Sequence, residues 1–299
     1  TDLPPSSLLL RNQQTPVSVS VVSFRELTHK QESIVTKRAL PMIIFLGFLW
    51  GSTMIASRFS LGQFNTLTFI AIRLLTGIIV FLLMYPLVFK RKLPTNKALI
   101  KQGIFLGIFG TALPMTLFVS ALSYQSSGIT AVLSALSPAF VALLAHFFVP
   151  DEKSSPKQAL GITISFSGAV FLVILGENGL SGETTTFIGF FLVILAVITG
   201  GFMDVYTRLR VQDCDARDIT LVRTITAMIV ILPLSIFLEG FDLSMVEVSG
   251  WVTMIYAAIA GTVMAILISL YNIQQFGVTT ASTVTYIIPL IATVGGWLL

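Results

Sequence analysis

The chain has 299 residues, of which 55% are hydrophobic and only 11% are charged, and its net charge is +4. A soluble domain carries about 25% charged residues, so this composition excludes an ordinary soluble enzyme, a disordered chain and a nucleic-acid-binding domain. The single cysteine, Cys214, excludes a disulfide framework and a cysteine-based zinc cluster. The composition therefore predicts a polytopic membrane protein.

The first 39 residues differ from the rest of the chain. They contain three prolines, several serines and threonines and scattered charges. Their one alternating apolar stretch, residues 17–24, is too short to cross a bilayer and lacks the apolar core that a cleavable signal needs. We expect residues 1–39 to form a disordered cytosolic tail.

Nine long apolar runs follow from Leu40 onward, separated by short breaks. A membrane-spanning helix needs about 20 apolar residues, because each residue rises about 1.5 Å across a hydrocarbon core of about 30 Å. The runs therefore predict nine spans, and the tight connections at residues 124–128 and 272–277 predict antiparallel hairpins. The predicted spans are Leu40–Ser57, Leu67–Phe89, Gly103–Leu122, Ile129–Phe148, Leu160–Leu175, Phe187–Val205, Ile219–Leu238, Trp251–Leu270 and Val278–Leu299.

The distribution of positive charge predicts the orientation in the membrane. With the N-terminus in the cytosol, fifteen of the 18 lysines and arginines lie in cytosolic segments, one lies outside and two lie within spans. Cytosolic segments of membrane proteins carry an excess of Lys and Arg, so this split predicts a cytosolic N-terminus, in the cell (inner) membrane. The basic charge is therefore a topology signal. The expected partners are the lipid bilayer and a small-molecule substrate, and no nucleic acid.

The chain repeats itself at an offset of about 150 residues. An ordered series of matches predicts two units, residues 40–175 and residues 187–299. Because each unit holds an odd number of spans, we expect an all-α membrane bundle of two inverted five-helix repeats, with nine of ten helices present and the last helix of the second repeat missing. A duplication that only stabilises a bundle is the alternative. The clearest matches are Trp50-Gly51 with Gly200-Gly201, Arg73 with Arg223, Gly110-Thr111 with Gly261-Thr262, and Pro138 with Pro289.

Short motifs in a fixed order carry a family resemblance. Over about residues 40–299 the chain resembles the EamA-type transporters of the drug/metabolite transporter superfamily. The resemblance implies ten helices in two five-helix repeats, and export or uptake of small metabolites such as amino acids and drugs. The motifs are Leu49-Trp50-Gly51-Ser52, Asn65 with Arg73-Leu74, Ser127-Gly128-Ile129-Thr130-Ala131 through Ser137-Pro138, and Phe276-Gly277 through Tyr286-Ile287-Ile288-Pro289.

Hydroxyl side chains recur at helical spacing in two spans and are candidate substrate ligands. Hydroxyls both donate and accept hydrogen bonds, so a stripe of them suits a polar cavity, although small hydroxyl residues also let membrane helices pack closely. Trp50 and Thr53 in the first span are further candidates, as an aromatic wall and a polar contact, or as core packing. The two stripes are Thr130, Ser134 and Ser137 in the fourth span and Thr279, Thr283 and Tyr286 in the ninth.

Arg73 and Arg223 are the two basic residues that lie within predicted spans, and we expect each of them to have a specific role. An arginine at the centre of a membrane helix costs about 2.5–3.5 kcal/mol on insertion scales, so each must face protein or water. Recognition of a carboxylate is one interpretation. We favour a structural or gating role, because each lies closer to the end of its span than to the middle.

Four further residues are gating or structural candidates. Pro138 and Pro289 each remove a backbone donor and can give the helix a bending point or remain a tolerated kink. Tyr124 and Asn272 are expected at opposite mouths of the cavity, as gates or as interfacial anchors. The only acid near a span interior, Asp204, is expected at the inner end of the sixth span, so no carboxylate proton relay is predicted.

These observations predict a secondary transporter of small metabolites, an exporter of amino acids or related amphipathic compounds that works by alternating access around a central cavity. The alternatives are a non-transporting membrane scaffold and an integral-membrane enzyme. The enzyme needs clustered catalytic groups or metal ligands, and the chain contains only two histidines, His29 and His146. We therefore expect no catalytic residue, no metal and no cofactor.

Overall fold

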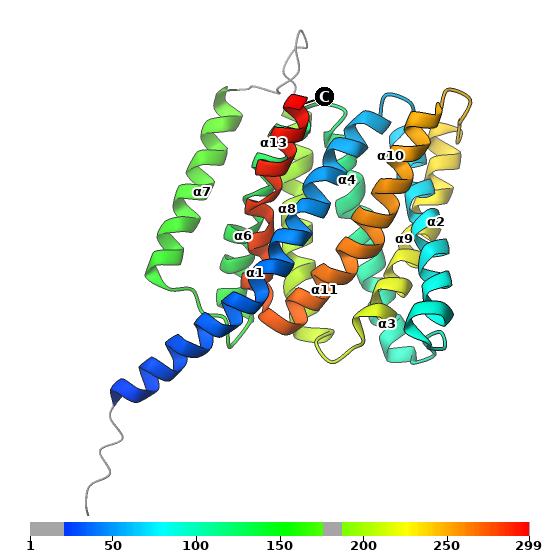
Figure 1. Ribbon diagram of the computed structural model, residues 1–299. Coiled ribbons are helices and arrows are strands. Elements are labelled where there is room, and N and C mark those ends of the chain that lie inside the picture. The colour runs from blue at the N-terminus through cyan, green and yellow to red at the C-terminus, as the bar shows by residue number, and fades with distance from the viewer. Residues whose placement is uncertain (1–20, 176–186, 299) are drawn as a thin grey trace, which may run out of the picture.

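The computed structural model describes residues 21–175 and 187–298, and these residues form a bundle of helices and connecting turns without strands (Figure 1). The all-α membrane bundle predicted from the sequence is confirmed. Three short segments are π-helical (η1, η2, η3) and one is a 3-10 helix (η4). The elements are α1 (Val21–Ser60), α2 (Thr66–Met84), η1 (Tyr85–Phe89), α3 (Lys97–Gly107), η2 (Ile108–Ala112), α4 (Leu113–Ala121), α5 (Ser127–Ser134), α6 (Ser137–Phe148), α7 (Pro156–Leu175), α8 (Phe187–Arg210), α9 (Ala216–Glu239), α10 (Val248–Ala258), η3 (Ile259–Met264), α11 (Ala265–Phe276), α12 (Val278–Ser282), η4 (Thr283–Tyr286) and α13 (Ile288–Leu298).

Eight helical segments within the described residues are long and apolar enough to cross a membrane. Together they account for eight of the nine predicted spans. They are Ala39–Ser60, Thr66–Phe89, Lys97–Ala121, Ser127–Phe148, Phe187–Arg210, Ala216–Glu239, Val248–Phe276 and Val278–Gly295.

The fifth predicted span corresponds to α7, which is helical but is not among those eight segments. It packs against α6 and stands apart from the rest of the bundle (Figure 1). Large apolar side chains on it, such as Leu160 and Ile164, are each 63% exposed. An apolar helix with so little protein contact is suited to a lipid environment.

The first helix begins earlier than expected. The sequence predicts a disordered tail up to residue 39, but α1 starts at Val21 and continues without interruption into the bundle. Residues 25–38 are rich in Arg, Glu, Lys and Gln and contain no proline, which favours a helix even without apolar periodicity. In Figure 1 this extension projects away from the bundle. Residues 1–20 of the expected tail lie outside the described residues.

Two spans are interrupted, at corresponding places in the two halves of the chain, residues 40–175 and 187–299. The fourth span unwinds at residues 135–136, between α5 and α6. The ninth span changes from an α-helix to the 3-10 helix η4, between α12 and α13. Pro138 and Pro289 are each the second residue of the helix that follows, where a missing backbone N–H costs nothing.

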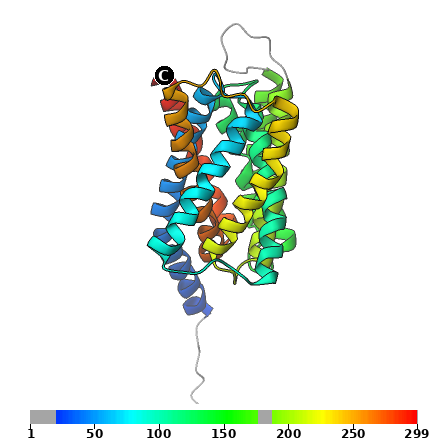
Figure 2. The same cartoon turned by 90° about the vertical axis from the view of Figure 1, so that its right-hand side faces the viewer.

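The two halves interleave. α2 packs against α9, and Figure 2 shows these helices side by side. α1 packs against α10, η3, α11 and α13, whereas α8 packs against α4, η2, α5 and α6. The first helix of each half thus lies against the π-helical turn of the other half, and the interrupted spans face the space between them.

Candidate functional site

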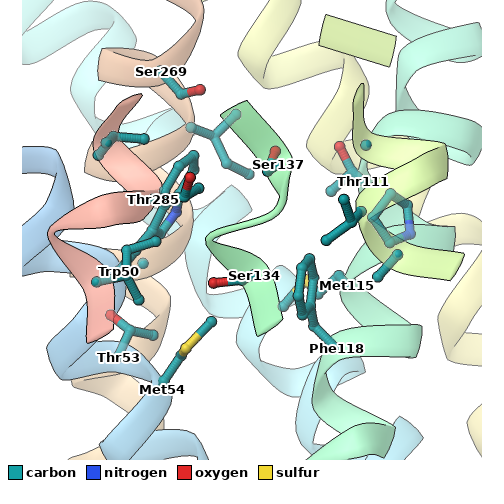
Figure 3. Close-up of a pocket in the computed structure, with 18 of the residues that line it drawn as sticks. Trp50, Thr53, Met54, Thr111, Met115, Phe118, Ser134, Ser137, Ser269 and Thr285 are labelled. Carbon is teal, nitrogen blue, oxygen red and sulfur yellow. The ribbon is translucent and has the colours of Figure 1, made fainter. Parts of the chain in front are cut away.

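A cavity of about 250 Å³ lies between the two halves of the chain. Residues of both halves contribute to its lining, and five of the eight predicted substrate ligands are among them. In Figure 3, Trp50 and Thr285 lie on one side of the space and Met115 and Phe118 on the other, with Ser134 between them. The five predicted residues are Trp50 and Thr53 on α1, Thr130 and Ser134 on α5, and Ser137 on α6.

The apolar part of the lining includes two aromatic and two thioether side chains among its aliphatic residues. Trp50 and Met54 come from α1, and Met115 and Phe118 come from α4. Met115 and Phe118 were not predicted from the sequence, although they follow Thr111 of the third span at i+4 and i+7 and share its face. Flexible methionines beside flat aromatic rings form a wall that adapts to apolar groups of different shape.

Three hydroxyl groups of the lining donate hydrogen bonds within their own spans. The Ser134 hydroxyl donates to the Ala131 carbonyl at 2.7 Å, and the Thr130 hydroxyl donates to the Ser126 carbonyl at 2.9 Å. The Thr285 hydroxyl likewise donates to the Ser282 carbonyl, at 2.9 Å. The Thr130 oxygen also accepts from Nε2 of Gln125 at 3.0 Å. Because the donors of Ser134 and Thr285 are used within their own spans, the lone pairs of these two hydroxyls remain for a ligand that donates hydrogen bonds.

The ninth span presents a different face from the one predicted. Thr279, Thr283 and Tyr286 do not line the cavity, and the Tyr286 side chain is 48% exposed on the outside of the bundle. Ala281, Thr285 and Ile288 line it instead.

The shift of the cavity face along the ninth span has a simple origin in the sequence. Between Gly128 and Pro138 the sequence advances ten residues, but between Gly277 and Pro289 it advances twelve. The predicted stripe used the offset of 149 that relates the two glycines, whereas the cavity residues follow the offset of 151 that relates the two prolines. Because Ala281 already corresponds to Thr130 at the offset of 151, the two extra residues lie between Gly277 and Ala281.

Arg73 and Arg223 both line the cavity, and each is held by the opposite half of the chain. Arg73 donates from Nε to the Thr262 hydroxyl at 2.9 Å and from Nη1 to the Ser57 hydroxyl at 3.4 Å. Arg223 donates from Nε to the Thr111 hydroxyl at 2.7 Å, and from Nη2 to the Gly110 carbonyl at 2.6 Å. Thr262 and Thr111 belong to η3 and η2, so each arginine binds the π-helical turn of the other half.

Asp204 also lines the cavity, on α8, next to Gly200 one turn earlier. From the sequence, Asp204 is expected at the inner end of the sixth span, without a predicted role. A signal was present, because Asp204 aligns with Met54 at the offset of 150 that relates Trp50 to Gly200. All four of these residues line the cavity.

The remaining predicted gating residues lie away from the cavity. Pro138 is buried at the start of α6, and Pro289 is partly buried at the start of α13. Tyr124 lies in the turn after α4 and is 38% exposed. Asn272 is fully buried in α11, and within the described part of the chain its side-chain nitrogen and oxygen have no hydrogen-bond partner.

A metal centre finds no support among the described residues. No group of three or more His, Cys, Asp or Glu side chains in residues 21–175 and 187–298 is arranged to hold a metal ion. The chemistry of the cavity is therefore that of its arginines, its one carboxylate, its hydroxyls and its apolar walls.

Comparison with known proteins indicates a family of membrane transporters. The model of the EamA-like transporter family matches residues 37–174 and 187–299. The "Uncharacterized transporter YoaV" of Bacillus subtilis (strain 168) is 22% identical over 257 residues, which cover 86% of this chain and 86% of that protein. The "Uncharacterized inner membrane transporter YedA" of Escherichia coli (strain K12) is 25% identical over 269 residues, covering 87% and 83%. A protein of known crystal structure shares the fold, with a TM-score of 0.65 and 18% identity over 86% of each chain.

Proposed function

The chain belongs to the EamA-like transporter family and is a multi-pass membrane transporter, and from this premise we propose that it exports amino acids or related small amphipathic compounds. Transport proceeds by alternating access around the central cavity, as a secondary transporter without a bound cofactor. The N-terminus lies in the cytosol, as the distribution of Lys and Arg favours.

One observation carries this proposal: the cavity is lined by matching positions of the two halves. At an offset of 151 residues, Ser134 corresponds to Thr285 and Ser137 to Ile288, and all four line the cavity. These positions lie at the interruptions of the fourth and ninth spans. Two inverted halves that share a central site can exchange conformations, which opens the site to each side of the membrane in turn.

The size and lining of the cavity support a small amphipathic substrate. Its volume of about 250 Å³ is below the range of about 300–1,000 Å³ that is usual for drug-sized ligands. Trp50 and Phe118 offer an apolar wall, and Ser134 and Thr285 offer hydrogen-bond acceptors. An amino acid with an apolar side chain presents the complementary groups.

The two alternative functions make different demands on the structure. An integral-membrane enzyme needs a cluster of catalytic groups or metal ligands, and a cavity with one carboxylate and two bound arginines is a poor candidate for either. A non-transporting scaffold has no need of a polar cavity between its halves. Family membership also favours transport over both alternatives.

Transport by the reconstituted protein tests the proposal. Purified protein in liposomes is expected to exchange radiolabelled apolar amino acids across the bilayer. Ser134→Trp fills the cavity and should abolish exchange. Thr163→Trp, on the exposed face of α7, is the matched control and should keep it. The proposal fails if the wild-type protein moves no amino acid, or if the two tryptophan variants behave alike.

A further inference from the structure

Two opposite charges face the cavity without forming an ion pair. Asp204 on α8 and Arg223 on α9 both line it. In the described part of the chain, no nitrogen of Arg223 lies within 4.0 Å of an Asp204 oxygen. Oppositely charged side chains that share a cavity of low polarity attract each other strongly, so a restraint is needed to keep them unpaired.

The restraint acts on Arg223. Its Nε donates to the Thr111 hydroxyl at 2.7 Å and its Nη2 donates to the Gly110 carbonyl at 2.6 Å, both in η2. A planar guanidinium that is fixed through two of its nitrogens cannot swing toward another group. Among the described residues Nη1 has no hydrogen-bond partner, so Arg223 keeps donors for a ligand.

The other half of the chain shows that the fold does not need this carboxylate. Arg73 occupies the corresponding position and also donates to a threonine of a π-helical turn, Thr262 of η3, while its second bond goes to Ser57 of its own half. The residue that corresponds to Asp204 is Met54, which also lines the cavity. The same helical framework therefore accommodates an apolar side chain at this position. Of these two corresponding positions, only the one in the second half carries a carboxylate.

A carboxylate and a guanidinium held apart in a membrane cavity complement a zwitterion. Exposing unpaired charges there costs free energy, and a ligand that pairs with both recovers it. We propose that Asp204 binds the ammonium group, and Arg223 the carboxylate group, of a substrate that carries both groups on one carbon atom. This inference rests on the proposed function and adds the polar recognition site to it.

The apolar walls orient the rest of the substrate. The polar site lies on α8 and α9, whereas Trp50 and Met54 come from α1 and Phe118 comes from α4. A zwitterion bound at the polar site can therefore direct its side chain toward these apolar groups. A substrate that lacks either charge leaves one buried polar group unpaired, which is the arrangement that gives strong discrimination.

Three related compounds provide the test. L-phenylalanine carries both charges, 3-phenylpropionate lacks the ammonium and L-phenylalanine amide lacks the carboxylate. In liposomes the wild-type protein is expected to transport L-phenylalanine at least about tenfold faster than either analogue, which corresponds to about 1.4 kcal/mol. Asp204→Asn should lower L-phenylalanine transport by about tenfold or more and leave 3-phenylpropionate transport unchanged.

Controls separate the possible outcomes. Asp213→Asn removes an exposed carboxylate from the loop after α8 and should behave like the wild type. If Asp204→Asn keeps the wild-type preference for L-phenylalanine, the inference is overturned while the proposed function stands. If the wild-type protein transports none of a full amino-acid panel, the proposed function itself fails.

A second variant covers the case in which Asp204→Asn does not fold. Asp204→Met places at this position the residue that the first half of the chain has at Met54. It should fold, as judged by its elution in gel filtration and its thermal midpoint, and it should lose the preference for L-phenylalanine. Failure of both neutral variants to fold would overturn the inference, because Asp204 would then be a structural residue.

Discussion

Arg73 on α2 donates from its Nε to the hydroxyl of Thr262 on η3, at 2.9 Å. The matching contact in the second half joins Arg223 on α9 to Thr111 on η2, at 2.7 Å. Donor and acceptor come from different halves in both contacts, so the two bonds cross the cavity interface in opposite directions. A pair of contacts of this kind ties the halves together on both sides of the cavity.

Thr262→Val barely changes the shape of the side chain, but we expect it to destabilise the protein strongly. Thr262 is 1% exposed, and valine removes the acceptor while Arg73 remains buried. Loss of a hydrogen bond to a charged group costs about 1.5–3 kcal/mol. Thermal unfolding in detergent measures the effect, with Thr163→Val as the control because Thr163 is exposed and bonds only to its own helix. Equal midpoints for the two variants would contradict a binding role of Thr262.

Gly261→Ala and Gly200→Ala form a matched pair in the same cavity. A methyl group at Gly261 would lie 2.4 Å from the Thr53 side chain and 2.5 Å from Nη2 of Arg73, so one of them must move. A methyl group at Gly200 meets no atom within 4 Å. We expect Gly261→Ala to lower both the thermal midpoint and transport and Gly200→Ala to keep the thermal midpoint of the wild type. A thermal midpoint for Gly261→Ala as high as that of Gly200→Ala would show that the guanidinium is not confined as described.

The sequence allowed much of the architecture to be predicted. Long apolar runs determine where helices can cross a membrane, so the bundle and the family resemblance are confirmed. The polar faces of the first and fourth spans were also found, because helical spacing places Thr130, Ser134 and Ser137 together and the helix is regular between the first two.

The remaining features of the cavity could not be predicted from the periodicity of the sequence. Two extra residues after Gly277 shifted the face of the ninth span, so Thr285 rather than Thr283 lines the cavity. The role of Asp204 depended on which helices approach α8. The repeated pairs Gly110-Thr111 and Gly261-Thr262 marked the segments that bind the arginines, but which arginine binds which segment depended on how the two halves pack.

Cysteine labelling distinguishes the observed face of the ninth span from the predicted one. In a Cys214→Ser background, Thr285→Cys and Ser134→Cys should react with a small membrane-impermeant thiol reagent, because both positions line the cavity. Thr283→Cys should react at least about tenfold more slowly, since it lies off the cavity face. Faster labelling at position 283 than at position 285 would instead support the face predicted from the sequence, in which Thr283 lines the cavity.

Asp215 makes stability depend on pH outside the membrane-spanning segments. Burial acts to raise its pKa, but hydrogen bonds from Arg217 and Arg91 outweigh burial and lower the pKa from its ordinary 3.8 to about 2. Because the folded-state pKa is the lower one, the stabilisation is present above about pH 4 and is lost as the pH falls toward 2. Asp215→Asn keeps an oxygen to cap α9 but loses the charge. Its thermal midpoint should lie below that of the wild type at pH 7, and the gap should close between pH 4 and pH 2. If the difference in thermal midpoint stayed constant between pH 7 and pH 2, the effect of the substitution would come from the helix cap alone.

Glu152 joins three elements through one carboxylate. It accepts hydrogen bonds from the backbone N–H groups of Val278 at 2.9 Å and Thr279 at 2.8 Å, the first two residues of α12, and its Oε1 lies 3.2 Å from Nε of Arg208 on α8. The close approach requires glycine at 277, whose φ is +84°, because a side chain there would lie 2.7 Å from Oε1. A negative charge at a helix N-terminus is also favoured by the helix dipole.

Removal of this carboxylate should therefore cost more than removal of its neighbour. Glu152→Ala leaves Arg208 and the two backbone donors without their partner, so we expect a loss of at least about 1.5–3 kcal/mol, the range for a single hydrogen bond to a charged group. Asp151→Ala, at the adjacent exposed position, should be close to neutral, because surface charges contribute about 0–1 kcal/mol. Glu152→Gln should fall between them, since glutamine retains one acceptor oxygen but cannot pair with Arg208. Thermal and denaturant unfolding in detergent give the order of the three, and an alanine at 152 as stable as the alanine at 151 would show that α12 does not depend on this carboxylate.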